Sequence, residues 1–278
     1  PYLVLTHTTA GVSALKKRLT REHIPAKNYS VTTIDGWLIR IAHSFKGSCH
    51  VGTTMDNPKL YYPEVRRVVL EYLNSGSLNC SLKASYSRLL VDEYQDCDVT
   101  QHALIKALAT VLPTTIFGDP MQCIFDFGRR NAMPEWEICI ENDFPLLGEL
   151  SRPWRWENAG TPRLGRWILD VREELMQGRQ IDLLSCPEYV TWHRLTGQLQ
   201  SDLANQRNAQ HFILNQHPND SLLVIGSSVN ELSRHQYAQG SSRIEVVEQV
   251  QLASVMLAAR MFDQQVGLHL VKSLLDVA

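Results

Sequence analysis

The sequence predicts an α/β fold in which helices flank both faces of a parallel β-sheet. Short apolar runs of four or five residues alternate with longer segments of helical periodicity, which is the pattern of repeated β-α units. Two of the apolar runs end in acidic residues, as expected where parallel strands deliver polar groups to a ligand site. The composition, with 44% hydrophobic and 20% charged residues among 278, is ordinary for a globular protein and excludes disordered and fibrous classes.

The first part of the chain follows a β-α-β-α order. Strands are predicted at 2–6 and 31–34, and helices at 11–19 and from Trp37 to Ile41, because apolar residues recur there at strand or helical spacing. Residues 44–60 contain the glycine, asparagine and proline typical of a loop, and a helix is predicted at 64–73. The sequence therefore predicts a small helical insertion near 44–86.

Two further strands, 88–91 and 114–117, lie on either side of a helix that Asp98 can cap. Leu104 and Leu108 fall on one face of this helix, so that face is expected to pack on the sheet. Strands that are joined by a single helix are usually neighbours in a parallel sheet. The acidic ends of these two strands are therefore expected side by side.

The chain is predicted to contain two α/β domains. Residues 1–158 form the first, and 159–215 form a helical or linker region that begins with a helix from Pro162 to Leu175. Residues 216–278 form part of the second, because strand-like runs at 221–226 and 244–247 alternate there with helical patterns.

Charge, cysteines and hydropathy exclude several classes of protein. A net charge of -2 still allows nucleic-acid binding, since this needs only a local basic track. Six scattered cysteines without a C-x-x-C pair favour reduced thiols over a zinc site or a disulfide framework. No apolar run is long enough to span a membrane and no signal-peptide pattern opens the chain, so a cytoplasmic protein without a membrane partner is expected.

The clearest chemical signal is the run Leu89-Leu90-Val91-Asp92-Glu93-Tyr94-Gln95-Asp96. Of two adjacent acids at the carboxyl end of a buried strand, one can hold Mg²⁺ and the other can take a proton from attacking water. The structural alternative is an ordinary strand end with solvated carboxylates. The second strand end, Gly118-Asp119-Pro120-Met121-Gln122-Cys123-Ile124-Phe125, favours the chemical interpretation.

In this order and spacing, the two segments resemble motifs II and III of the UvrD/Rep/PcrA group of superfamily 1 DNA helicases. The resemblance implies a RecA-like P-loop NTPase domain, the start of a second RecA-like domain, and ATP and Mg²⁺ as cofactors. It implies Asp92 as the Mg²⁺ ligand, Glu93 as the general base, and Gln95 and Gln122 as sensors of the γ-phosphate. Leu150-Ser151-Arg152-Pro153-Trp154-Arg155 resembles motif IV, which makes Arg155 the arginine expected at the γ-phosphate, with Arg152 as its rival.

The same resemblance implies contacts to single-stranded DNA. Residues 6–11 are similar to motif Ia, which assigns backbone contacts to Thr6, Thr8 and Thr9, and residues 32–37 are similar to motif Ib, which assigns one to Thr33. Asp35 stands where the family usually has histidine. The alternative for both segments is a capped helix start. Phe125 and Phe127 match aromatic positions that stack on bases, with core packing as the alternative.

Two departures qualify the implied function, an ATP-dependent 3′-5′ DNA helicase or translocase of the cytoplasm or nucleoid. No G-x-x-x-x-G-K-[ST] phosphate loop is present, and the resemblance implies that this loop precedes residue 1; motifs V and VI have no match before Ala278. The 278 residues alone are therefore expected to be inactive. The alternatives are a catalytically silent nucleic-acid-binding module and a P-loop ATPase of another class. The expected partner is single-stranded DNA or DNA with a single-stranded tail, and a nuclease or repair partner is left open.

Overall fold

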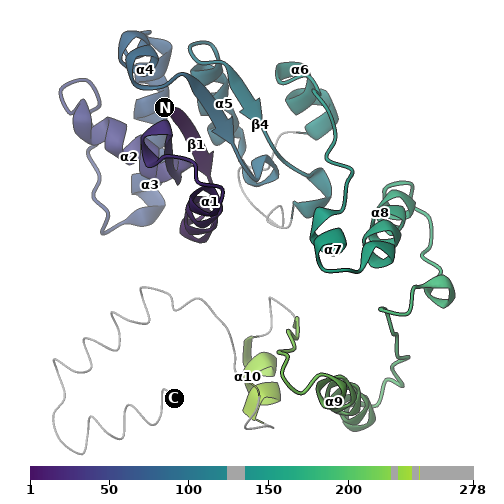
Figure 1. The fold of residues 1–278 in the computed structure, drawn as a ribbon. Coiled ribbons are helices and arrows are strands. Elements are labelled where there is room, and N and C mark those ends of the chain that lie inside the picture. Colours follow the sequence, from purple (N-terminus) through teal and green to yellow (C-terminus); the bar gives the residue numbers. More distant parts are fainter. Residues whose placement is uncertain (124–134, 227–230, 240–243, 245–278) are drawn as a thin grey trace, which may run out of the picture. The chain divides into compact units, whose positions relative to one another are not determined.

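The computed structural model describes residues 1–123, 135–226, 231–239 and 244 (Figure 1). The chain divides into two compact units, Pro1–Arg152 and Pro153–Ala278, and each is considered by itself. The observed division falls six residues before the predicted boundary at 158. Phe125, Phe127 and most of the predicted second α/β domain lie outside the described residues. Among the described helices, none is long and apolar enough to cross a membrane.

Unit 1 is built on a four-stranded parallel sheet with the strand order β2-β1-β3-β4. The strands are β1 (Tyr2–Thr6), β2 (Tyr29–Thr33), β3 (Arg88–Val91) and β4 (Thr114–Ile116). In the register of the central strands Tyr2 lies opposite both Tyr29 and Arg88, so the carboxyl ends of β1 and β3 meet at one edge of the sheet. The predicted parallel sheet and the predicted neighbourhood of 88–91 and 114–117 are confirmed.

Helices cover both faces of this sheet. They are α1 (Thr9–Arg21), α2 (Ile34–Ser44), α3 (Pro58–Asn74), α4 (Asn79–Ser85), α5 (Val99–Ala109) and the short α6 (Glu141–Asp143). Single turns of 3₁₀-helix lie at η1 (Ala26–Asn28), η2 (Tyr94–Asp96) and η3 (Pro120–Gln122), and a π-helical turn lies at η4 (Trp136–Ile140). Right-handed crossovers place α1 on one face, because the chain moves from β1 to β2 in one direction. They place α3 and α5 on the other, because the chain then returns past β1 to β3 and β4 (Figure 1).

The helix α3 is part of the core of unit 1. It packs against α2 and α5, and its buried residues Val65 and Val69 belong to the same apolar cluster as Leu3 and Leu89 of the sheet. The segment 44–86 was predicted as a small helical insertion, and it is helical, but α3 does not stand apart from the domain. Its apolar stripe at helical spacing packs in the core together with α2 and α5.

An arginine of α3 joins the first turns of two other helices. The Arg66 guanidinium donates to both carboxylate oxygens of Asp35, at 2.7 Å each, and to the Asp98 carboxylate at 2.8 Å. Asp35 lies in the first turn of α2, and Asp98 caps α5 through the amides of Thr100 and Gln101 at 2.9 Å. The predicted cap at Asp98 is therefore confirmed, and the same carboxylate also binds α3.

Unit 2 contains helices in the part that the structure describes. They are α7 (Trp154–Asn158), α8 (Pro162–Met176), the 3₁₀ turn η5 (Leu183–Ser185), α9 (Leu199–Gln216) and α10 (Glu231–Gln239). The helix predicted from Pro162 to Leu175 is confirmed by α8. The strand predicted at 221–226 is wrong, because these residues are neither helix nor strand and Leu223 and Ile225 are 78% and 87% exposed. A run of four apolar residues, Leu222 to Ile225, does not by itself specify a buried strand.

Candidate functional site

The turn that follows β3 holds its two acidic residues in different environments. The amide of Asp92 donates to the carbonyl of Leu5 at 2.8 Å, so this residue still belongs to the sheet. Glu93 has a left-handed backbone with φ 55° and ψ 47°, and its side chain is exposed. Such a conformation costs a non-glycine residue on the order of 1 kcal/mol or more and persists only where the surrounding structure fixes it. The sharp turn directs two successive carboxylates away from the strand.

A hydrogen-bonded bridge connects the ends of β3 and β4 through Gln95. The Gln95 amide nitrogen donates to the Glu93 carboxylate at 2.5 Å, and its amide oxygen accepts from the backbone N–H of Asp119 at 3.0 Å. Asp119 in turn accepts from the Gln122 side chain at 2.8 Å. Gln95 is buried, so its side chain is largely shielded from competing water, whereas the bond from Gln122 to Asp119 is exposed. The two sequence segments that resembled motifs II and III therefore form one connected structure.

Gly118 allows the two strand ends to approach each other closely. A Cβ atom at this position would lie 2.7 Å from Trp136 Cη2 and 3.1 Å from both the Gln95 amide oxygen and Tyr94 Cβ. The first distance is shorter than any ordinary contact, so a larger residue would push the Trp136 ring away. Gly118 is therefore needed because a side chain at this position would collide with Trp136 and crowd the Gln95 side chain.

A cavity of about 330 Å³ opens at this edge of the sheet. The residues that line it include Thr6, Thr8 and Arg18 from β1 and α1, Asp92, Glu93 and Gln95 from the turn after β3, and Gln122 from η3. The structure thus brings together four of the five predicted catalytic residues and two of the predicted DNA-binding threonines. Their chemical roles stay predictions.

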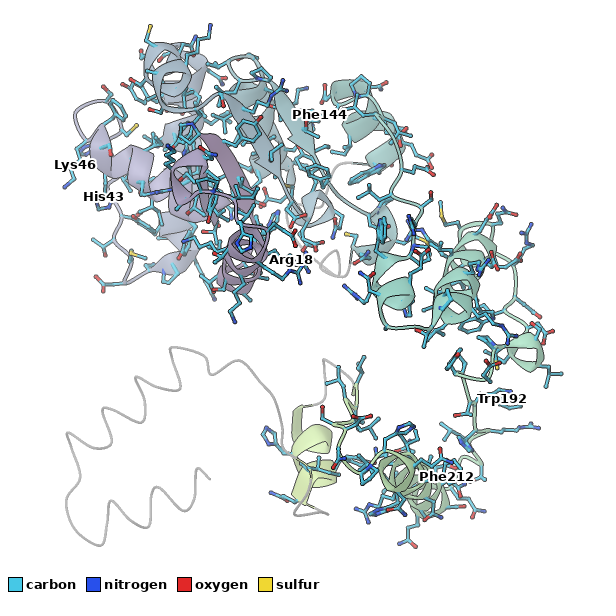
Figure 2. The ribbon with its side chains drawn as sticks, viewed as in Figure 1. Arg18, His43, Lys46, Phe144, Trp192 and Phe212 are labelled. Carbon is cyan, nitrogen blue, oxygen red and sulfur yellow. The ribbon has the colours of Figure 1, made fainter. Side chains whose placement is uncertain are left out.

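Arg18 is a cavity residue that the sequence reasoning missed. Together with Gly11, Ala14 and Leu15 it lines the cavity, and these four residues follow the i, i+3, i+4, i+7 spacing of one helix face. Arg18 projects from the last turns of α1 (Figure 2). This spacing, read together with the position of α1 directly after β1, is the signal in the sequence that could have identified it.

The electrostatics of the cavity favour a bound cation beside Asp92. Burial, followed by the charge of neighbouring Glu93, raises the pKa of Asp92 above its ordinary value, while a hydrogen bond from the Glu93 backbone and the charge of Arg18 oppose this shift. No group of three or more His, Cys, Asp or Glu side chains in the described part of the chain is arranged to hold a metal ion. Mg²⁺ typically binds through one or two carboxylates, with water and substrate phosphates as its other ligands. Asp92 and the adjoining cavity fit that mode of binding.

The predicted DNA-contacting threonines start two helices. Thr8 caps α1 by accepting from the Gly11 amide, and Thr33 caps α2 by accepting from the Gly36 amide, both at 3.0 Å. The capped helix start, which was the alternative for both segments, is therefore present, and each hydroxyl still has a proton to donate. Thr6 is buried at the end of β1, and Thr9 is exposed on α1 outside the cavity. Asp35 is paired with Arg66.

Two of the assigned roles concern residues that the site does not include. Phe125 and Phe127 lie outside the described residues, so both the stacking and the packing interpretations remain. Arg155 belongs to unit 2, where it is exposed on α7 with its guanidinium 5.7 Å from the centre of the Trp156 ring. Its rival Arg152 is the last residue of unit 1. The role of either arginine at a phosphate stays a prediction.

Comparison with known proteins bears on the same part of the chain. Residues 62–145 match the family model of the UvrD/REP helicase N-terminal domain. These residues include the turn after β3, the Gln95 bridge and η3. Over this region the chain is UvrD/Rep-like. The matched region begins within α3, which agrees with α3 being part of the domain core.

Three curated relatives extend this result. The ATP-dependent DNA helicase Rep of Buchnera aphidicola subsp. Acyrthosiphon pisum is 33% identical over 88 residues, which is 31% of this chain and 13% of that protein. Its counterpart from Buchnera aphidicola subsp. Schizaphis graminum is 46% identical over 66 residues, 23% of this chain and 9% of that protein. Rep of Escherichia coli K12 is 34% identical over 73 residues, 26% of this chain and 10% of that protein. The matches thus span about a tenth of the length of these relatives.

Proposed function

We propose that this chain contributes to the first motor domain of an ATP-dependent DNA helicase that couples ATP hydrolysis to 3′-5′ movement on single-stranded DNA. The observation that carries the proposal is the bridge through Gln95, which joins the acidic turn after β3 to Asp119 and Gln122 around one cavity. A solvated strand end would have no need for a buried glutamine that links it to the next strand. The UvrD/Rep-like character of residues 62–145 supports the same assignment.

In the proposed reaction each side chain at the site has a separate role. Mg²⁺, held by Asp92 and by water, would neutralise charge on the transferred phosphoryl group. Glu93, with an exposed carboxylate, accepts a proton from the attacking water. Gln95 and Gln122 hold the turn and η3 in place, so that a change at the phosphate alters both strand ends together. Arg155 is proposed to stabilise the negative charge that develops at the γ-phosphate.

Single-stranded DNA is the proposed polymer partner. The hydroxyls of Thr6 and Thr8 lie at the cavity next to the acidic turn, and the amides of the first turn of α1 suit a phosphate. Contacts there would depend on the backbone and not on the base sequence. The adjacency of these threonines to Glu93 offers a short route by which DNA binding could alter hydrolysis.

The test is the rate of ATP hydrolysis by the full-length gene product with and without a single-stranded oligonucleotide. Wild type is expected to be strongly stimulated by DNA, and Glu93→Gln is expected to lose roughly 100-fold or more in kcat while it still binds nucleotide, because a general base contributes that much. Glu71→Gln is the matched control, since Glu71 is an exposed glutamate on α3 far along the chain from the turn. Hydrolysis that is absent, or that ignores DNA, would replace the helicase proposal with the catalytically silent nucleic-acid-binding module.

A further inference from the structure

A chain of hydrogen-bonded side chains, which the proposed reaction does not use directly, connects the acidic turn to α5 and α6; it begins at a buried tyrosine and ends at a partly exposed aspartate. Tyr94, which follows Glu93, is completely buried, and its hydroxyl lies 2.8 Å from Nδ1 of His102 on α5. The other ring nitrogen of His102, Nε2, lies 2.9 Å from the Asp143 carboxylate on α6. Lys106 also pairs with Asp143, at 2.8 Å. Two helices of unit 1, α5 and α6, are thus linked to the residue next to Glu93.

The directions of these hydrogen bonds follow from the protonation states. Burial raises the pKa of the Tyr94 phenol, so Tyr94 keeps its proton and donates it to Nδ1 of His102. Burial lowers the pKa of His102, so the ring is neutral at pH 7 and donates from Nε2 to Asp143. The Tyr94 hydroxyl and both ring nitrogens of His102 then each have a hydrogen-bond partner, and such a satisfied network rigidifies its surroundings.

Aromatic contacts add to this fixation. The Tyr94 ring meets His102, Trp136 and Phe144 in edge-on geometry, with ring centroids 6.0, 6.4 and 5.8 Å apart (Figure 2 labels Phe144). Edge-on aromatic pairs contribute about 0.5–1.5 kcal/mol each beyond the burial of their area. Trp136 also covers Gly118, which stands beside the Gln95 bridge. The same cluster therefore supports both strand ends.

Glu93 needs such support because its backbone is left-handed. On its N-terminal side Asp92 is held by the carbonyl of Leu5 at 2.8 Å, and on its C-terminal side the Tyr94 amide is held by the carbonyl of Phe117 at 2.9 Å. The ring and hydroxyl of Tyr94 fix that second neighbour in the core. Two fixed neighbours leave Glu93 no means to relax its strained backbone by rotation of the turn.

We infer that Tyr94, His102 and Asp143 are positioning residues, which hold the turn of Glu93 and Gln95 in the geometry required for hydrolysis. The inference rests on the proposed function, because it assigns these side chains an effect on that reaction. None of the three lines the cavity, so they act through the turn and leave the binding of ATP unaltered. Misplacement of a catalytic group by about 1 Å can cost a rate on the order of 100-fold.

The experiment compares steady-state hydrolysis by full-length variants in saturating single-stranded DNA. Tyr94→Phe removes only the hydroxyl, and His102→Gln keeps a group near the Nε2 position while it removes the partner of Tyr94. Both are expected to lower kcat roughly tenfold with KM for ATP within about twofold of wild type. His102→Asn places an amide near Nδ1, restores a partner for Tyr94, and is expected to recover most of kcat.

Tyr61→Phe is the control, because it removes the hydroxyl of another buried tyrosine, on α3, away from the turn. It is expected to match wild type. The inference is overturned if Tyr94→Phe turns over like Tyr61→Phe, or if the two His102 variants lose activity equally and in proportion to their loss of folded protein in thermal unfolding. A wild type that fails to hydrolyse ATP would instead overturn the proposed function itself, whereas an active wild type with unaffected variants overturns only the positioning role.

Discussion

Replacing Arg66 tests how strongly α3 holds the helices on its side of the sheet together. Arg66→Met keeps an unbranched apolar stem but removes the guanidinium and with it three charge-assisted hydrogen bonds, two to Asp35 and one to Asp98. It leaves two carboxylates facing each other at the starts of α2 and α5. Breaking a buried ion pair from one side costs about 3–5 kcal/mol. The side chains of Arg66, Asp35 and Asp98 are 17%, 29% and 13% exposed, so water can partly replace the arginine.

We therefore expect a loss of about 3 kcal/mol in the free energy of unfolding, at the lower end of that range. Arg67→Met is the matched control, because Arg67 is the next residue on α3 and pairs with Glu71 where both side chains are about 60% exposed. It is expected to change stability by less than about 0.5 kcal/mol. Urea unfolding of the full chain gives the magnitudes, and hydrogen exchange in peptides from α2 and α5 locates the loss. Equal effects of the two substitutions would refute the role assigned to Arg66.

Three further predictions follow from the same structure. Gly118→Ala should destabilise by about 1–3 kcal/mol in urea unfolding, since the new methyl group meets Trp136, whereas no loss would remove the need for glycine there. Asp92→Asn should raise the thermal midpoint at pH 7 without nucleotide or metal. Because the pKa of Asp92 is raised in the folded protein, its ionised form destabilises the fold at pH values above that pKa. The gain in thermal midpoint from Asp92→Asn should therefore shrink as the pH falls below the raised pKa. A gain that does not depend on pH would contradict this reasoning. Val69→Ala should lower the free energy of unfolding by about 2 kcal/mol, because Val69 is buried, whereas Leu60→Ala at an exposed position should change it little. Equally small changes for both variants would show that α3 is not part of the core.

The strands of unit 1 could be predicted from the sequence because local and long-range signals agree there. Residues 2–6 and 88–91 are apolar runs bounded by polar residues, and their observed bounds are those predicted. The adjacency of the two acidic strand ends followed from the rule that strands joined by one helix pair with each other. The cap at Asp98 was predictable because its side chain acts on amides two and three residues away.

Other features could not be predicted because they depend on residues distant in the sequence. The left-handed backbone of Glu93 is imposed by hydrogen bonds that its neighbours make to Leu5, Phe117 and Asp119. The residues next to Glu93 in the sequence give no local sign of these distant partners. The pairing of Asp35 with Arg66 spans 31 positions, so the residues around Asp35 give no local sign of it. The apolar run at 221–226 was misinterpreted, since hydrophobicity without periodicity does not specify a strand.

The central claim, that the cavity beside the turn after β3 is a site for Mg²⁺ and nucleotide phosphates, is tested most directly by a crystal structure. The full-length gene product would be crystallised with Mg²⁺, a non-hydrolysable ATP analogue and a single-stranded oligonucleotide. We predict a cation bound to the Asp92 carboxylate, at about 2.0–2.1 Å or through one water, with the terminal phosphate facing Glu93, Gln95 and Gln122. An analogue that binds elsewhere, with no cation near Asp92, would contradict the account.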